Sequence, residues 1–346
     1  MKSARAGFLQ SDLTQILTTS RNELELLNSA KILICGGTGF LGTWLTTTLL
    51  EANEKFDLNL RVTLISRDLK KSRIKLRIEN QDPVSIIEGD LTTKPSILNS
   101  LEGNFSHIIH AATPIVKQTG ANDLDKMGKT ALLTSENLIQ LASRMKEAPS
   151  LTHLSSGAVY GSQSTPDLRI PENSEISGRV TEKSYYGRIK LKSEELVAHA
   201  DSKGLLRGSN PRLFTFFGPH LAMDEHFAIG NFLRNALKGE KIQVKGNPLT
   251  TRSYLYPTDM VSWLLAVIVS PTMKAIHIGS DIPFQMRELA ETVSNLIGLN
   301  GVEYLSESDV VSTYVPETKR MRSMYNVSQT VNLEDGLRRW VSWLQT

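Results

Sequence analysis

The stretch Lys31-Ile32-Leu33-Ile34-Cys35-Gly36-Gly37-Thr38-Gly39-Phe40-Leu41-Gly42 decides the fold of this chain. Four of its first five residues are apolar, and three glycines follow with the spacing G-x-x-G-x-x-G, at Gly36, Gly39 and Gly42. An apolar face then resumes over residues 44–50. This pattern predicts a buried parallel strand, a tight glycine turn and the first turns of a helix.

Glycines at this spacing are typical of turns that bind phosphate. A side chain would keep the backbone from approaching a pyrophosphate, and the N-terminus of the next helix supplies unpaired N–H groups and a partial positive charge. The same triplet also occurs in ordinary strand-to-helix turns, so the motif alone leaves both interpretations open. As a dinucleotide site, it predicts cofactor contacts from Gly36, Gly39, Phe40, Leu41 and Gly42.

Composition is that of an ordinary globular enzyme. The 346 residues include 40% hydrophobic and 22% charged residues, enough for a substantial core. The formal net charge of +3 gives no argument for nucleic-acid binding. A basic cluster within 67–77 is interpreted as a solvated face or as an edge that meets a cofactor phosphate.

Cysteine and histidine usage predicts neither a disulfide nor a metal site. Cys35 is the one cysteine, and the seven histidines show no spacing typical of a metal site. No apolar run approaches membrane-spanning length, and the N-terminus lacks the pattern of a signal peptide. We therefore expect a cytoplasmic protein with neither a membrane nor a nucleic-acid partner.

Strand and helix patterns alternate along most of the chain, which predicts an α/β fold with a doubly wound, mostly parallel sheet. Strand patterns occur at 31–35, 60–65, 84–88, 107–110, 151–155, 212–217 and 275–279. Long helical patterns occur at 123–147, from 184 onward and at 226–238. Residues 1–30 carry apolar side chains at helical spacing, so we expect one or two amphipathic helices docked on the domain.

The second strand ends at Ser66, Arg67 and Asp68. In a dinucleotide fold this end meets the adenine ribose. A hydroxyl and a guanidinium suit the 2′-phosphate of NADP, because Arg pairs with phosphate through two hydrogen bonds. If Arg67 is only a surface charge and Asp68 binds the ribose, the cofactor is NAD. We favour NADP(H) and keep NAD(H) as the alternative.

Two further strand ends extend the predicted cofactor site. Asp90, followed by Leu91, suits a hydrogen bond from the adenine amino group, or alternatively the N-cap of a helix. After the fourth strand come Ala111 and Ala112, whose small side chains let the cofactor ribose pass close by, and then Thr113.

Ser156, Tyr186 and Lys190 predict a centre for carbonyl–alcohol redox chemistry. Tyr186 and Lys190 stand at i and i+4 of a predicted helix, so phenol and ammonium share a face. The ammonium is expected to favour the phenolate over a free phenol, whose pKa is ~10. Tyr186 then donates a proton to a ketone oxygen as hydride arrives from a reduced nicotinamide, Ser156 shares the developing charge, and Lys190 holds the nicotinamide ribose. Because Y-x-x-x-K alone is common, the specific signal is its order after a glycine turn and a Ser-Ser strand end.

Together these motifs resemble the extended short-chain dehydrogenase/reductase family, in its nucleotide-sugar epimerase/dehydratase group. The resemblance covers nearly the whole chain after residue 30, in the family's order. Its pieces are residues 36–42, 89–91, 110–112, 155–161, 186–190, 212–214 with 218–219, and 252–259.

The resemblance implies a Rossmann-type domain and a smaller mixed α/β C-terminal domain that binds a nucleoside diphosphate sugar. We place an N-terminal helical extension at 1–30, the dinucleotide-binding domain at 31–215 with 250–282 returning to it, and the sugar-nucleotide domain at 216–249 and 283–346. Family members usually form homodimers by packing the helices around 123–147 and 184–203.

The resemblance also implies roles for single residues. Ser156, Tyr186 and Lys190 correspond to the family's catalytic triad. Asn231 and Arg252 match positions that often meet the diphosphate or nucleotide. On the substrate side we add Thr113 and Thr215.

Departures from the family pattern narrow the reaction. Sugar 4,6-dehydratases carry an Asp-Glu pair where Gly157 and Ala158 stand, and sugar-acid decarboxylases usually carry Glu at the place of Ala158. Epimerase–reductases that make fucose nucleotides have Cys at the place of Gly157, although His220 resembles their second acid/base residue. Thr215 replaces the Asn of R-x-F-N, which leaves the sugar pose open.

We therefore expect an NADP(H)-dependent reductase of a nucleotide-linked 4-keto-6-deoxy sugar in polysaccharide biosynthesis, similar to the dTDP-4-keto-6-deoxyglucose reductases. The alternative is a nucleotide-sugar 4-epimerase, in which the same triad oxidises and re-reduces C4 on a tightly held NAD. A non-catalytic dinucleotide-binding protein is a second alternative, which the presence of both Tyr186 and Lys190 disfavours.

Overall fold

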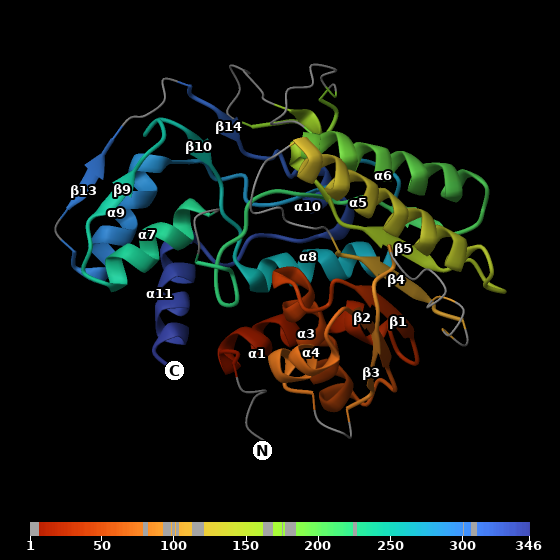
Figure 1. The fold of residues 1–346 in the computed structure, drawn as a ribbon. Helices are drawn as coiled ribbons and strands as arrows, with labels where there is room; N and C mark the ends of the chain where they lie inside the picture. Colours follow the sequence, from red (N-terminus) through yellow and green to blue (C-terminus); the bar gives the residue numbers. More distant parts are fainter. Residues whose placement is uncertain are drawn as a thin grey trace.

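A six-stranded parallel sheet forms the centre of the structure, a computed structural model (Figure 1). It describes residues 7–78, 82–92, 98, 101, 104–112, 121–161, 169–174, 176, 185–223, 227–299, 301–305 and 310–346. The strand order is β3-β2-β1-β4-β5-β7. The strands are β1 (Lys31–Cys35), β2 (Arg61–Ser66), β3 (Val84–Glu88), β4 (His107–His110), β5 (Ser150–His153) and β7 (Arg207–Ser209). This order confirms the prediction of a Rossmann-type α/β fold.

Strand β1 lies in the middle of the sheet because its side chains are apolar on both faces. Ile32, Leu33 and Ile34 are fully buried. Its register pairs Ile32 with Val62 of β2 and Leu33 with Ile108 of β4, both in parallel. Strands that are apolar in a continuous run need helices on both faces of the sheet, and this structure supplies them.

Helices cover the two faces of the sheet. On one face, α3 (Phe40–Phe56) and α8 (Pro257–Val269) pack into the larger apolar core, with α1 (Gln10–Thr19) and α2 (Arg21–Glu25) against them. On the other face, α5 (Ala121–Ala142) and α6 (Tyr185–Ser202) pack side by side, as Figure 1 shows. No helix in the described ranges is long and apolar enough to span a bilayer.

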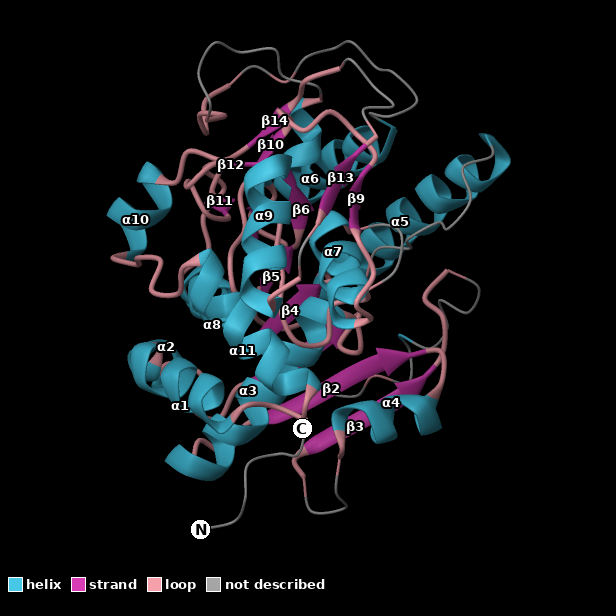
Figure 2. Cartoon of the chain, turned by 90° about the vertical axis from the view of Figure 1, so that its left-hand side faces the viewer, coloured by secondary structure: helices cyan, strands magenta, loops and turns pink. Residues whose placement is uncertain are grey.

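A second apolar core gathers the C-terminal elements beside the sheet (Figures 1 and 2). Its helices are α7 (Ala228–Leu237), α9 (Met286–Ile297) and α11 (Leu333–Leu344), and α10 (Lys319–Tyr325) lies against α8. Three small sheets complete the fold. They comprise β9 (Ile242–Val244) with β13 (Val302–Tyr304); β10 (Thr251–Arg252) with β12 (Phe284–Gln285) and β14 (Thr313–Tyr314); and β6 (Ser155–Ser156), β8 (Arg212–Leu213) and β11 (His277–Ile278). The predicted domain boundaries remain a prediction.

Two predicted strands differ from the structure. The strand predicted at 212–217 is confined to β8, and the main sheet is completed instead by β7, which sequence analysis missed. Pro211 stands between β7 and β8 and has no N–H to donate, so the chain leaves the main sheet there. The strand predicted at 151–155 is likewise divided, at Leu154, between β5 and β6.

Helices α1 and α2 form within the N-terminal extension, as the apolar spacing predicted. Asp12 of α1 is fully buried and accepts hydrogen bonds from the Tyr256 hydroxyl and from Nη1 of Arg339, both at 2.8 Å. A buried carboxylate is tolerable only with such partners. The extension is therefore fixed both to the start of α8 and to α11.

The packing of α1 generates a first prediction. Leu13 is fully buried in α1, so Leu13→Ala leaves a cavity and is expected to lower the free energy of unfolding by about 2–4 kcal/mol. Leu26, just beyond α2, is 73% exposed, so Leu26→Ala is the matched control with an effect of about 0.5 kcal/mol or less. Chemical denaturation of both variants measures the difference. Equal small effects would show that the extension is not part of the folded core.

Candidate active site

The glycine turn between β1 and α3 is shaped partly by the protein's own packing. Gly36 has φ +87°, and a Cβ there would lie 2.7 Å from the backbone of Ala111 and Ala112. A Cβ at Gly42 would lie 2.1 Å from the Gly36 carbonyl oxygen. A Cβ at Gly39 would meet only that same oxygen, at 3.4 Å. Packing within the protein therefore does not require glycine at position 39, and the space beside this residue is open.

That open space lies at the start of a helix. Gly39 is the N-cap residue of α3 and has no side chain to accept from the N–H groups of the first turn, Phe40 to Gly42. Such N–H groups and the positive end of the helix dipole attract anions. The turn thus fits the pyrophosphate of a dinucleotide, which would approach over Gly39.

At the adenine end, Asp68 is already engaged by the protein. It is the N-cap of α4 (Leu69–Leu76), and its Oδ1 accepts from the Lys71 backbone N–H at 2.8 Å. The Ser66 hydroxyl lies 2.6 Å from that of Ser72. Arg67 is exposed, and no described hydrogen bond or ion pair occupies its guanidinium.

The remaining polar groups at this end surround Arg67. Burial would raise the pKa of Asp90, but hydrogen bonds from Thr92 and the charge of Arg67 lower it overall, so Asp90 is ionised. Lys75 of α4 reaches back to the glycine turn, where its Nζ donates to the Thr38 carbonyl oxygen at 2.5 Å. Sequence analysis gave Lys75 no role beyond the basic cluster. The side chain of Leu91 is buried in the core, which leaves its backbone for a cofactor contact.

The structure brings Ser156, Tyr186 and Lys190 together. Ser156 ends β6 and caps the 3-10 helix η2 (Gly157–Tyr160), and its Oγ accepts from the Ala158 N–H at 3.2 Å. Tyr186 lies in the first turn of α6, close enough to Ser156 for that hydroxyl to lower the pKa of its phenol. Lys190 follows one turn later, with Nζ 5.9 Å from the centroid of the Tyr186 ring.

Burial sets the protonation of this group. It raises the pKa of Tyr186 to about 12, and the Ser156 hydroxyl offsets only part of that rise. It lowers the pKa of Lys190 to about 7, against the opposing charge of Glu194. The Lys190 ammonium donates to the Leu154 carbonyl oxygen at 2.6 Å. The expectation that Lys190 draws the phenol toward phenolate is therefore wrong for this structure, and Tyr186 is a protonated phenol at neutral pH.

A buried ion pair supports the helix that carries Tyr186 and Lys190. Arg212 of β8 forms two hydrogen bonds with the carboxylate of Glu194, from Nη2 at 2.7 Å and from Nε at 3.0 Å. The Ser155 hydroxyl donates to the same carboxylate at 2.5 Å, and Arg212 also donates to the Tyr160 hydroxyl at 2.7 Å. Sequence analysis missed Glu194, although it continues the four-residue spacing of Tyr186 and Lys190.

Helix α6 also packs directly on the backbone of η2. A Cβ at Gly187 would lie 2.0 Å from the Ala158 carbonyl oxygen. Glycine is required here because the helix must approach this closely. The contact sets the distance between Ser156, on one side of it, and Tyr186 on the other.

The residues predicted on the substrate side lie on different elements of the structure. Asn231 lies on α7, and its side-chain carbonyl oxygen is buried without a partner among the described residues. Arg252 lies in β10 and donates to the Thr251 and Ser312 carbonyl oxygens at 2.8 and 3.1 Å. Thr215 follows β8 and is partly buried, and Thr113 lies outside the described residues.

His220 lies in an aromatic cluster. Its ring centroid is 4.5 Å from that of Phe8 and 5.0 Å from that of Trp343. Burial lowers its pKa to about 4, so the imidazole is neutral at pH 7. The described residues contain no group of three or more potential His, Cys, Asp or Glu ligands for a metal ion.

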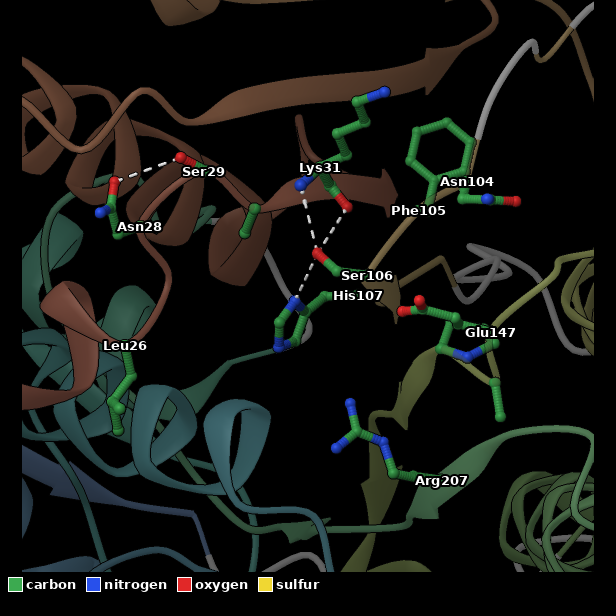
Figure 3. A pocket seen from close by; sticks show the side chains of 13 residues that line it. Leu26, Asn28, Ser29, Lys31, Asn104, Phe105, Ser106, His107, Glu147 and Arg207 are labelled. Carbon is green, nitrogen blue, oxygen red and sulfur yellow. Dashed lines mark hydrogen bonds between the residues drawn. The ribbon is translucent and has the colours of Figure 1, made fainter.

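A cavity of about 370 Å³ lies at the end of the sheet where the parallel strands begin, away from the glycine turn (Figure 3). Lys31, Ser106, His107, Glu147 and Arg207 are among its lining residues. None of the predicted catalytic or cofactor residues lines it. In open α/β sheets ligands bind at the carboxyl ends of the strands, where the glycine turn and Ser156 are found, so this cavity is not the candidate active site.

Comparisons with known proteins agree with this geometry. Residues 32–279 match the family model "NAD dependent epimerase/dehydratase family". The chain therefore belongs to that family, and it is an NAD(P)-dependent oxidoreductase of the extended short-chain dehydrogenase/reductase type.

Curated relatives include UDP-glucuronic acid decarboxylases. UDP-glucuronic acid decarboxylase 1 of Xenopus tropicalis is 25% identical over 323 residues, which cover 91% of this chain and 72% of the relative. UDP-glucuronic acid decarboxylase 5 of Arabidopsis thaliana is 29% identical over 280 residues, which cover 80% of this chain and 77% of the relative. Among solved structures, an epimerase from Methanothermobacter thermautotrophicus aligns with TM-score 0.79 at 21% identity, over 95% of this chain and 96% of its own. UDP-glucose 4-epimerase from Thermotoga maritima aligns with TM-score 0.76 at 18% identity, over 91% and 98%. At these identities the structural matches show the shared fold.

The contact of Gly187 generates a second prediction. Gly187→Ala forces α6 away from η2, so we expect unfolding free energy to fall by about 1–3 kcal/mol and turnover to fall about 100-fold through misplacement of Tyr186. A Cβ at Gly246 would meet no neighbouring atom within 4 Å, and that residue has no positive φ, so Gly246→Ala is the control with neither effect. Thermal unfolding and steady-state turnover are the measurements. Wild-type behaviour of Gly187→Ala would contradict the close packing.

Proposed function

We propose that this protein is an NADP(H)-dependent reductase of a nucleotide-linked 4-keto-6-deoxy sugar. The observation that carries the proposal is a protonated, partly buried Tyr186 near Ser156 and Lys190, with neither a carboxylate nor a thiol at the two residues that follow Ser156. A neutral phenol is the form that donates a proton, as ketone reduction requires. Gly157 and Ala158 provide no carboxylate or thiol, which disfavours dehydration, decarboxylation and epimerisation beside a ketone.

The relation to the curated decarboxylases supports the nucleotide-sugar class and not their reaction. Their names identify UDP-glucuronic acid as the substrate of those proteins. In this chain, Ala158 presents a methyl group where decarboxylases of the family usually carry Glu. We therefore propose that Ser156, Tyr186 and Lys190 support only hydride transfer and the proton transfer that accompanies it.

The residues would divide the reduction as follows. A bound reduced nicotinamide supplies the hydride that reaches the sugar C4. Tyr186 gives its phenolic proton to the former carbonyl oxygen, and the Ser156 hydroxyl donates a hydrogen bond to that oxygen as negative charge develops. Lys190 holds the nicotinamide ribose through its ammonium. Because burial lowers the pKa of Lys190 to about 7, it can return a proton to Tyr186 near neutral pH.

The substrate would bind against α7, which carries Asn231, and β10, which carries Arg252. Arg252 offers a guanidinium to the diphosphate, and Asn231 offers a buried carbonyl oxygen that lacks a partner among the described residues. We assign Thr113 and Thr215 to the sugar. The paired helices α5 and α6 are the surface proposed for a homodimer.

The 2′-phosphate of NADP is the proposed partner of Arg67. Oδ1 of Asp68 is used to cap α4, whereas the Arg67 side chain is exposed beside Asp90. Ser66 lies next to Arg67, and its hydroxyl, which pairs with that of Ser72 at 2.6 Å, is proposed as a second ligand of the phosphate. Arginine binds phosphate with directed, charge-assisted hydrogen bonds.

The reaction generates a third prediction. Purified protein is expected to oxidise NADPH with at least one member of a panel of 4-keto-6-deoxy sugar nucleotides. Tyr186→Phe removes the proton donor and should lower kcat about 100-fold or more. The neighbouring phenol supplies the control, because Tyr185→Phe should keep wild-type turnover. Interconversion of C4 epimers by a protein that retains stoichiometric NAD would instead identify a 4-epimerase, and an unchanged function of Tyr186→Phe in cells would favour a non-catalytic role.

Cofactor choice generates a fourth prediction. Arg67→Ala should raise the Kd for NADPH about 10- to 100-fold, because it removes charge-assisted hydrogen bonds worth about 1.5–3 kcal/mol, and should leave the Kd for NADH within about twofold. Arg61 is exposed at the opposite end of the same strand, so Arg61→Ala is the control. Calorimetric titration measures both constants. A wild-type protein that binds NADH more tightly than NADPH would overturn the assignment.

A further inference from the structure

Lys75 brings a positive charge to the glycine turn from a second helix. It lies in the last turn of α4, which packs beside α3 (Figure 1). Its Nζ donates to the Thr38 carbonyl oxygen at 2.5 Å, across 37 positions of the chain. Thr38 directly precedes Gly39, the residue over which the pyrophosphate would approach. The ammonium therefore lies beside the part of the turn that fits phosphate.

Contacts at both ends of α4 fix the backbone that carries Lys75. At the start of the helix, Oδ1 of Asp68 accepts from the Lys71 N–H at 2.8 Å. At its end, Leu76 is only 3% exposed and belongs to the larger apolar core. The glycine turn is therefore within constant reach of the Lys75 side chain.

The Lys75 ammonium has more donors than its described partner uses. An ammonium carries three N–H donors and no acceptor. One of them donates to the Thr38 carbonyl oxygen, and in the part of the chain that the structure describes no carboxylate forms an ion pair with Lys75. Two donors and a full positive charge are thus available to an anion at the turn.

The surroundings of Lys75 disfavour its charge as long as no anion is bound. Burial and the ammonium of Lys71, one helical turn earlier on α4, lower the pKa of Lys75. An opposite charge within ~4–6 Å has the reverse effect and favours the ammonium. A phosphate beside Nζ would offset both effects.

We propose that Lys75 binds a phosphate of the dinucleotide cofactor, together with the N–H groups at the start of α3. The inference rests on the proposed cofactor site and not on the proposed reaction. An ammonium meets the same chemistry in the pyrophosphate and in the 2′-phosphate, namely charged oxygens that accept hydrogen bonds. NADH and NADPH distinguish the two, because both carry the pyrophosphate and only NADPH carries the 2′-phosphate.

The test removes the charge of Lys75 and measures cofactor binding. Lys75→Gln keeps a side chain that can donate to Thr38, and we expect it to raise the Kd for NADPH about 5- to 20-fold in calorimetric titration. An equal rise for NADH would identify the pyrophosphate as the partner of Lys75. A rise for NADPH alone would identify the 2′-phosphate.

Two further variants serve as controls. Lys55 is exposed in the last turn of α3, at the end of that helix away from the glycine turn, so Lys55→Gln removes the same charge at a distance. It should leave both Kd values within about twofold. Lys75→Arg keeps the charge and should keep both Kd values within about threefold of the wild type. Unchanged Kd values in Lys75→Gln, or equal losses in Lys75→Arg and Lys75→Gln, would overturn the proposal.

Binding measurements keep this inference distinct from the proposed function. If the wild type binds NADH more tightly than NADPH, the assignment of Arg67 fails, yet a raised Kd for NADH in Lys75→Gln still supports Lys75 as a ligand of the pyrophosphate. If the wild type oxidises NADPH and Lys75→Gln binds it as the wild type does, the reaction stands and the role of Lys75 is rejected. A wild type that binds neither cofactor would overturn both.

Discussion

The ion pair between Glu194 and Arg212 is the interaction on which the candidate site depends. It joins α6, which carries Tyr186 and Lys190, to β8, and the Ser155 hydroxyl ties the same carboxylate to the strand that carries Ser156. Both charged residues are only 8% exposed. Burying two charges carries a high desolvation cost, and removal of one partner of such a pair destabilises proteins by about 3–5 kcal/mol. The pair therefore specifies a single placement of α6.

The same burial gives the site its chemistry. A dry environment disfavours charge on every group that it surrounds, so it raises the pKa of the Tyr186 phenol and lowers that of the Lys190 ammonium. His110 and His153 lie beside each other with ring centroids 5.1 Å apart, and burial together with Lys190 lowers the pKa of each and keeps both neutral. The result is a proton donor that is neutral, next to an amine that titrates near physiological pH.

Local patterns predicted the parts of the fold that depend on local sequence. The glycine turn after β1 was predicted because Gly36 and Gly42 stand where any side chain would clash with the backbone. Strands β3 and β4 were predicted from their apolar residues. Strand β7 was missed because Arg207, Gly208 and Ser209 carry no apolar pattern, and its place in the sheet is set by pairing with β5.

Contacts between distant segments could not be predicted in this way. Helical spacing put Tyr186 and Lys190 on one face, yet it contains no information on burial, so the direction of the phenol pKa shift was predicted wrongly. The contact of Tyr314 in β14 with Ser156, whose hydroxyl oxygens lie 3.3 Å apart, was missed for a related reason, since the two residues are 158 positions apart in the sequence. The family was identified because its motifs are local, and the cofactor and substrate assignments remain predictions.

The most direct test of this account is a crystal structure of the protein with NADPH and a nucleoside diphosphate bound. The account predicts that the pyrophosphate lies over Gly39 and the 2′-phosphate against Arg67. It also predicts that the nicotinamide ring lies beside Tyr186 and that the Lys190 ammonium lies within hydrogen-bonding distance of the nicotinamide ribose. The hydride-donating carbon of the nicotinamide should lie ~3–4 Å from the position of the substrate carbonyl. A nicotinamide ring bound away from Ser156 and Tyr186, or a Tyr186 hydroxyl that faces solvent in the complex, would contradict it.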